Sequence, residues 1–183
     1  MLRRDVIFGL AAVGLAGCGS ASTRPLGPDG LPLPSAYVIR PGDEATIQFR
    51  MLDSVNALRQ TAGVPPVALD ARLNAAAATH SRDMAVQNRP WLFGSDGSSP
   101  VERARRVGFA GRLLGENISE SFESELQTLS AWMAQPDTRA VILDPNARFM
   151  GFSWYQEESA KLWWTLNMGS DPTVSQPIPG AAF

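Results

Sequence analysis

Cysteine and histidine are almost absent from this chain of 183 residues, which contains one of each, Cys18 and His80. A single cysteine excludes an intrachain disulfide. It also excludes a structural zinc site built from Cys and His, because such sites usually need four ligands of these types. A Cys–His nucleophilic pair or a Ser–His–Asp triad would have to use these two residues. The sequence is therefore poor in the side chains on which many enzymes depend.

An excess of charge of one sign is also lacking. The chain has 16 basic and 18 acidic residues, for a net charge of −2, and the two signs are interspersed. This gives no basic surface for nucleic acid, so we predict no nucleic-acid partner. The hydrophobic content of 44% and the length are ordinary for one globular domain.

Residues 1–17 have the pattern of a secretory signal peptide. Arg3 and Arg4 precede an apolar run at 6–16, which is shorter than the roughly 20 residues that a membrane span needs. The two arginines also resemble a twin-arginine export signal, although Val6 stands where Phe is usual. We therefore exclude this segment from the fold.

The segment Leu15-Ala16-Gly17-Cys18 resembles the lipobox of bacterial lipoproteins. This resemblance implies cleavage before Cys18 and acylation of that residue, with palmitate or a similar chain. Several acyl chains would anchor the protein stably to a membrane. Gly19 rather than Asp after the cysteine favours, by the same resemblance, the periplasmic face of the outer membrane. The alternative is an ordinary signal peptide with a chance cysteine.

The composition divides the remaining chain into a tether, a domain and a tail. Residues 18–45 are rich in Pro and Gly, which favours an extended linker without a core of its own. Within it, residues 37–39 are a candidate short strand or docking point. A domain is expected over 46–169, and the Pro- and Gly-rich residues 170–183 form a C-terminal tail.

Hydrophobic periodicity predicts an α+β fold for the domain. A first helix begins near residue 46 and ends at "AGVPP" (62–66), and Asp70 is a plausible N-cap for a second. Ser99 and Glu102 form a capping box for a third helix that runs to Gly108. A strand or extended turn at 112–119, a helix at 122–134, a short helix at 137–145 and a hairpin of strands 148–156 and 161–169 follow. The fourth helix is expected to turn four side chains inward: Phe122, Leu126, Leu129 and Met133.

Together these segments resemble the CAP superfamily of cysteine-rich secretory, antigen 5 and pathogenesis-related proteins, and in particular its disulfide-free bacterial branch. The pieces that carry the resemblance are "MLDSVNALRQTAGVPPVALDARLNAAAATHSRDMA", "SDGSSPVERARRVGF", "GENI", "AWMAQPDTRAVILDP" and the closing "FMGFSW…WWTLNMG" hairpin. The resemblance spans residues 48–169 and implies an α–β–α sandwich with a central antiparallel sheet and a groove along one face.

The same resemblance implies a set of candidate groove residues: Leu92, Glu116, Asn117, Thr138 and Arg139. The family groove usually holds two histidines and one or two glutamates, and some members bind a divalent metal there. The two histidine positions are occupied here by Leu92 and Thr138, whereas Glu116 of "GENI" remains. One carboxylate without imidazole partners does not make a metal site. We therefore predict no metal, no cofactor and a structural role for Glu116, which would accept backbone N–H bonds or pair with an arginine such as Arg139.

Each of the other conspicuous side chains has a structural and a functional interpretation. His80 falls on the apolar stripe of the second helix, so a core histidine with both ring nitrogens satisfied is favoured over a catalyst. The apolar loop with Trp91 and Phe93 is either a buried plug over the groove or a contact site. Trp163 and Trp164 are core residues, or one of them lies exposed and lines an apolar groove.

Three functions remain open from the sequence. The favoured one is a lipid-anchored protein of the bacterial cell envelope, whose degenerate CAP domain is non-catalytic and binds a peptidoglycan, lipid or periplasmic protein ligand. The second is a hydrolase of cell-wall glycan that uses Glu116, with Glu120 or Asp137, as a carboxylate pair. The third is a lipid carrier that uses the groove and the Trp91 loop.

Overall fold

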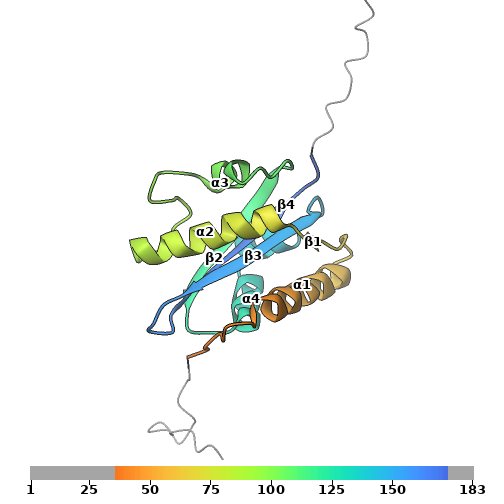
Figure 1. Cartoon of the computed structure of the whole chain (residues 1–183). Helices are drawn as coiled ribbons and strands as arrows, with labels where there is room; N and C mark the ends of the chain where they lie inside the picture. Colours follow the sequence, from red (N-terminus) through yellow and green to blue (C-terminus); the bar gives the residue numbers. More distant parts are fainter. Residues whose placement is uncertain (1–35, 173–183) are drawn as a thin grey trace, which may run out of the picture. The chain divides into compact units, whose positions relative to one another are not determined.

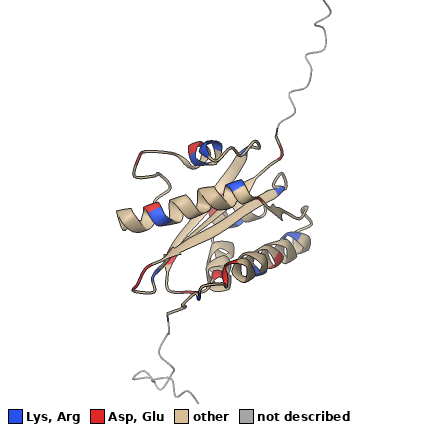
Figure 2. Cartoon of the chain, in the orientation of Figure 1, with Lys and Arg blue, Asp and Glu red and all other residues tan. Residues whose placement is uncertain are grey.

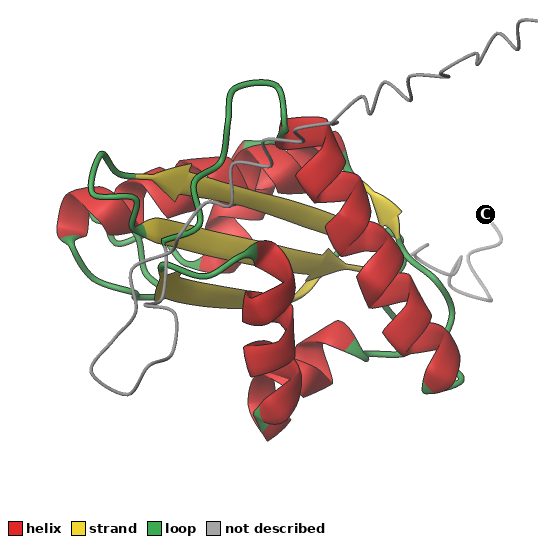
Figure 3. Cartoon of the chain, turned by 90° about the horizontal axis from the view of Figure 1, so that it is seen from below, coloured by secondary structure: helices red, strands yellow, loops and turns green. Residues whose placement is uncertain are grey.

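A computed structural model describes residues 36–172 of the chain. The predicted signal peptide, Cys18, most of the predicted tether and the tail from residue 173 lie outside this part. Within it, one four-stranded sheet lies between two layers of helices (Figures 1 and 3). The predicted mixed fold, a sheet between two layers of helices, is confirmed.

Three of the five helices in residues 36–172 begin at a residue whose side chain caps the helix. The five helices are α1 (Glu44–Thr61), α2 (Ala71–Gln87), α3 (Pro100–Arg106), α4 (Glu125–Ala134) and α5 (Pro136–Ile142). The carboxylate of Asp70 accepts the backbone N–H groups of Arg72 and Leu73 at the start of α2. Ser99 and Glu102 form the predicted capping box of α3. None of the helices within residues 36–172 is both long and apolar enough to cross a bilayer.

The strands are β1 (Ala68–Leu69), β2 (Leu113–Ser121), β3 (Phe149–Gln156) and β4 (Leu162–Gly169), in the order β1-β3-β4-β2. The predicted hairpin of β3 and β4 is confirmed, and β2 pairs antiparallel with β4. The strand β1 pairs parallel with β3 and was not predicted, because two residues carry no periodic pattern.

Alternation along the strands divides the core between the two faces of the sheet. One face packs against α1, α4 and α5, and its buried strand residues are Met150, Phe152, Leu162, Trp164, Leu166 and Met168. On the other face α2 crosses β3 and β4 (Figure 1), and Leu73, Ala104 and Phe109 form a second, smaller cluster beside α3. Both faces of the sheet are therefore covered, which leaves any binding site to the helices and loops.

The predicted inward face of the fourth helix is wrong at two of its four residues, Phe122 and Leu126. The helix α4 begins at Glu125, with Ser124 as its N-cap, and this phase buries Leu129 and Trp132 while Phe122 and Leu126 lie exposed. For Trp163 and Trp164 the interpretation as core residues is confirmed, since they point to opposite faces of the sheet and both are fully buried. Neither tryptophan of this pair lines a surface groove.

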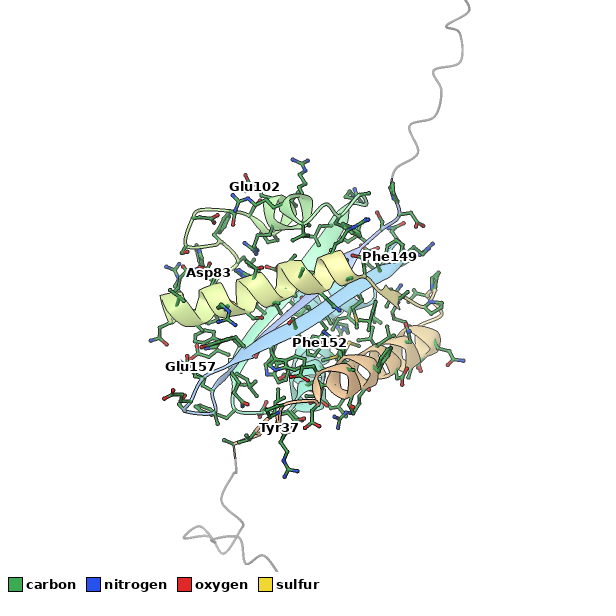
Figure 4. All side chains as sticks on the ribbon, in the orientation of Figure 1. Tyr37, Asp83, Glu102, Phe149, Phe152 and Glu157 are labelled. Atoms are coloured by element: carbon green, nitrogen blue, oxygen red, sulfur yellow. The ribbon has the colours of Figure 1, made fainter. Side chains whose placement is uncertain are left out.

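The chain that enters the domain docks beside the hairpin. The backbone N–H of Tyr37 donates to the Phe122 carbonyl at 2.8 Å, and the side chain of Gln156 bonds both the Tyr37 carbonyl and the Ile39 N–H. Figure 4 shows Tyr37 at this edge, next to α1. Residues 37–39 thus act as a docking point rather than as a strand.

We predict that Gly151→Ala destabilises the domain by about 3 kcal/mol, because an added methyl group would overlap the backbone of Leu73 where α2 packs on β3. Gly115→Ala is the matched control on β2. Its methyl group would meet only the Val141 side chain, 2.6 Å away, which can shift. Urea unfolding of both variants measures the difference, and equal costs would contradict the predicted close approach of α2.

Candidate functional site

The five candidate groove residues do not meet at one place. Glu116 and Asn117 are neighbours on β2, so their side chains point to opposite faces of the sheet. Asn117 donates to the Thr138 carbonyl at 2.9 Å, and Arg139 donates to the Met133 carbonyl, both on the side of α4 and α5. Glu116 lies on the side of α2 and α3, together with the backbone of Leu92.

The partner of Glu116 is Arg103 of α3, not Arg139. The Arg103 guanidinium donates to the Glu116 carboxylate at 2.7 Å, and the same nitrogen donates to the Leu92 carbonyl at 2.8 Å. A second guanidinium nitrogen donates to the Ser98 carbonyl at 2.8 Å. Arg103 therefore joins β2, the loop before α3 and α3 itself, and it lies between the two family positions Leu92 and Glu116.

His80 completes a buried cluster, which we call the Glu116 cluster and which consists of Glu116, Arg103 and His80. The His80 Nε2 atom is 3.5 Å from the Glu116 carboxylate, and the side chains are 0%, 5% and 1% exposed for His80, Arg103 and Glu116. The prediction that both imidazole nitrogens are satisfied is not confirmed, because within the described residues neither makes a hydrogen bond of standard geometry. The burial of His80 itself agrees with a core residue.

Burial shifts the pKa values of two groups in this cluster, Glu116 and His80. Desolvation raises the pKa of the Glu116 carboxyl to about 7, against the opposing pull of Arg103. Desolvation, followed by the charge of Arg103, lowers the pKa of His80 to about 4. At neutral pH the imidazole is therefore uncharged, and the carboxyl is close to the midpoint of its titration.

The donor set at this place does not fit a divalent metal. The single carboxylate is occupied by Arg103, and the two positions where the resemblance implies histidine carry Leu92 and Thr138. Thr138 lies on the other side of the sheet from Glu116. Among residues 36–172 no group of three His, Cys, Asp or Glu side chains is placed to hold a metal ion. We derive no chemistry through a metal here.

An open pocket lies on the outer side of Arg103, between α2, α3 and the loop that joins them. This α2–α3 pocket has a volume of about 330 Å³ and is lined by Ala76, Thr79, Asp83, Ser95, Asp96, Ser98, Arg103, Arg106 and Val107. Figure 4 labels Asp83 on the α2 side of this region and Glu102 on the neighbouring α3. These residues lie in two of the sequence pieces that carry the family resemblance, but sequence reasoning assigned none of them to a site, because they come from two helices and a loop that only the fold brings together.

The loop with Trp91 and Phe93 is exposed, so it is not a buried plug. Trp91, Leu92 and Phe93 are 42%, 43% and 46% exposed. The rings of Trp91 and Phe93 lie 5.8 Å apart, and the Arg89 guanidinium lies 3.8 Å from the centre of the Trp91 ring. Of the two interpretations from the sequence, the contact site is the one that this exposure favours.

With this geometry in place, comparison with known proteins assigns the family. Residues 52–168 match the model of the CAP, or cysteine-rich secretory protein, family, and the chain belongs to that family. The uncharacterized protein YkwD of Bacillus subtilis is 27% identical over 123 residues, which cover 67% of this chain and 47% of YkwD. The chain thus spans about half the length of this relative.

Solved structures show the same fold at low identity. An extracellular protein containing a SCP domain from Bacillus anthracis has a TM-score of 0.65 at 21% identity, over 73% of this chain and 45% of that one. An outer surface protein of Borrelia burgdorferi has a TM-score of 0.64 at 12% identity, over 74% of this chain and 98% of that one. A cysteine-rich secretory protein of Staphylococcus aureus has a TM-score of 0.60 at 13% identity, over 73% of this chain and 41% of that one.

The Glu116 cluster predicts opposing effects of pH on stability. Because the folded-state pKa of Glu116 is raised from 4.5 to about 7, its contribution is full below pH 4.5 and is lost as pH rises through 7. Because the folded-state pKa of His80 is lowered from 6.5 to about 4, its contribution is full above pH 6.5 and is lost as pH falls through 4. In the wild type the two effects largely cancel between pH 4.5 and 6.5.

We predict that Glu116→Gln removes only the first effect. The free energy of unfolding of the variant should then rise with pH across this window, where that of the wild type is nearly flat. The difference between the two proteins should change by about 3 kcal/mol from pH 4.5 to 7. Urea unfolding at half-unit steps of pH measures it, and parallel profiles would contradict a buried, raised Glu116.

Proposed function

We propose that the chain is a lipid-anchored protein of the bacterial cell envelope whose CAP domain is a non-catalytic binding module for a cell-wall, lipid or protein ligand. The observation that carries this proposal is the state of Glu116. Its carboxylate is 1% exposed and is held by Arg103. A group that is covered and paired in this way holds the domain together and is not available to a substrate.

The envelope location rests on the N-terminal sequence. The basic start, the short apolar run and Cys18 match the pattern of a bacterial lipoprotein. Two relatives of the same fold are described as extracellular and as an outer surface protein. Those words apply to these relatives, and for this chain they support an envelope location that experiment has to test.

The alternative of a carboxylate-dependent hydrolase is disfavoured by the geometry of its candidate pairs. Glu120 follows Glu116 by four residues on β2, which places their Cα atoms about 13 Å apart along a strand. Glu120 is also paired with Lys161 at 3.1 Å. Asp137 belongs to α5, on the other side of the sheet. Carboxyl pairs that cleave glycosidic bonds lie about 5 to 10 Å apart on either side of one substrate.

The first experiment tests the anchor. When the full-length chain is expressed in a Gram-negative host with labelled palmitate, we expect label on the protein and recovery in the outer-membrane fraction. Cys18→Ser should lose both, because no other cysteine is present to carry the thioether-linked diacylglycerol. The control is Ser20→Ala, two residues away, which should keep the label. An unlabelled wild-type protein in the soluble periplasm would refute lipid anchoring.

The second experiment tests binding against hydrolysis. The detergent-solubilised full-length protein is mixed with purified peptidoglycan sacculi, and both co-sedimentation and release of soluble sugar fragments are measured. We expect saturable binding without fragment release, for the wild type and for Glu116→Gln alike. Trp91→Ala reports whether the exposed loop takes part in contact. Fragment release that depends on Glu116 would establish the hydrolase instead, and absence of binding would leave lipid and protein ligands.

A further inference from the structure

The geometry points to the α2–α3 pocket as a binding site for a neutral, hydroxyl-rich ligand, a sugar ring of a glycan. This inference rests on the proposed function, since it names the ligand class and the residues of a binding module. No group of the Glu116 cluster other than Arg103 lines the pocket, so the site lies beside the family groove positions rather than in them.

The pocket has the size and walls of a site for a compact ligand. A volume of about 330 Å³ is at the lower end of the range for small-molecule sites. Two helices and a loop supply its lining, and none of its lining residues belongs to a strand. An extended peptide commonly pairs with a sheet edge, which this pocket does not offer. The small volume also gives little room for an acyl chain.

The charges of the lining are balanced, which disfavours an ionic ligand. Two carboxylates, of Asp83 and Asp96, face two guanidiniums, of Arg103 and Arg106. Arg106 pairs with Asp96, and Arg103 with Glu116 behind the pocket wall. Figure 2 shows acidic and basic positions side by side on α3 and the loop before it. A phosphate would have to break one of these pairs, whereas a neutral molecule leaves both intact. Among residues 36–172 no group of three His, Cys, Asp or Glu side chains is placed to hold a metal ion at the remaining carboxylate, Asp83.

The acceptors of the pocket are fixed in place and are only partly used. Asp83 accepts the Ser95 N–H at 2.7 Å, the Ser95 hydroxyl at 2.5 Å and the Gln87 side-chain amide at 2.9 Å. A carboxylate has about four lone-pair positions, so one stays open on Asp83 Oδ1. The Thr79 hydroxyl donates to the Ala75 carbonyl at 2.9 Å, which leaves its lone pairs as acceptors.

The donors are placed in the same way. Asp96 accepts the Ser98 N–H at 2.9 Å and one N–H of Arg106, and the remaining guanidinium N–H groups of Arg106 are left for a ligand. A hydroxyl both donates and accepts, so a polyol can use the carboxylates and the guanidinium at once. Ala76 and Val107 supply an apolar patch for the C–H face of the ring. These features together favour a sugar.

The probes are two neutral oligosaccharides, the β-1,4-linked tetramer of N-acetylglucosamine and the α-1,4-linked tetramer of glucose. Each is titrated into the detergent-solubilised full-length protein by calorimetry. We expect one of them to bind, and Arg106→Gln to weaken that binding about 10-fold or more, since a hydrogen bond from a charged donor is lost. Arg105→Gln is the matched control. Arg105 directly precedes Arg106 in α3, is also exposed and faces away from this pocket.

Further variants and probes separate the outcomes. Thr79→Val should also weaken binding, without touching a charge. Inorganic phosphate and Ca²⁺ at millimolar concentration should not compete. If neither sugar binds while sacculi are still bound, the sugar pocket is wrong and the proposed binding function stands. Equal effects of Arg106→Gln and Arg105→Gln, or competition by phosphate or Ca²⁺, would likewise overturn the pocket assignment. A wild-type protein that binds neither sugar nor sacculi would count against both.

Discussion

The guanidinium of Arg103 is the interaction on which the helical layer around α3 depends. It reaches from α3 to Glu116 of β2 and to two carbonyl groups of the preceding loop, at Leu92 and Ser98. Because α3 has only seven residues, it contributes little helical stability of its own. A buried pair with several hydrogen bonds can fix such an element, whereas removal of one partner would leave an unpaired charge in the interior. Through Arg103, Glu116 thus anchors α3 and the loop before it to β2.

A second buried arginine has the same role on the opposite side of the sheet. Arg59 at the end of α1 is fully buried and donates to four carbonyls, those of Pro65, Ile142, Asp144 and Ala147. These carbonyls belong to the loop after α1 and to the connection between α5 and β3. Because a guanidinium has five N–H donors and no acceptor, it suits loops that expose several carbonyls to the interior. In each case an arginine holds in place a loop that lacks the regular backbone hydrogen bonds of a helix or sheet.

Elements with a strong local signal could be predicted from the sequence, and elements set by tertiary contacts could not. Asp70 and the Ser99–Glu102 pair mark helix starts by their own chemistry, and alternation marks the hairpin of β3 and β4. The phase of α4 differs from the predicted one because Phe122 is apolar and lies before the true N-cap, Ser124. The side chains of α3 show most clearly which features could not be predicted from the sequence. Its sequence contains three arginines, and only packing beside Ala104 decides that Arg103 turns inward.

The same limit applies to the candidate site. The motif around Glu116 correctly marks a residue that enters the interior, but β2 places its neighbour Asn117 on the other face, so the candidates are divided between two layers. The partner of Glu116 lies 13 residues earlier in the chain. Neither the spacing nor the residue type distinguishes Arg103 from Arg139 as this partner. The assignment requires the fold, because only the fold says which helix covers which face.

The replacement of the family histidines by Leu92 and Thr138 has a consistent physical consequence. Leu92 and Thr138 offer Glu116 no imidazole, and Thr138 lies on the other side of the sheet. Here the Leu92 carbonyl and Glu116 share one guanidinium nitrogen, so the carboxylate is closed off at the cost of a raised pKa. Closing this position moves the accessible polar groups outward, to Asp83, Asp96 and Arg106. Because Glu116 is buried in this pair, a ligand that binds on this side of the domain must use the surface outside the pair.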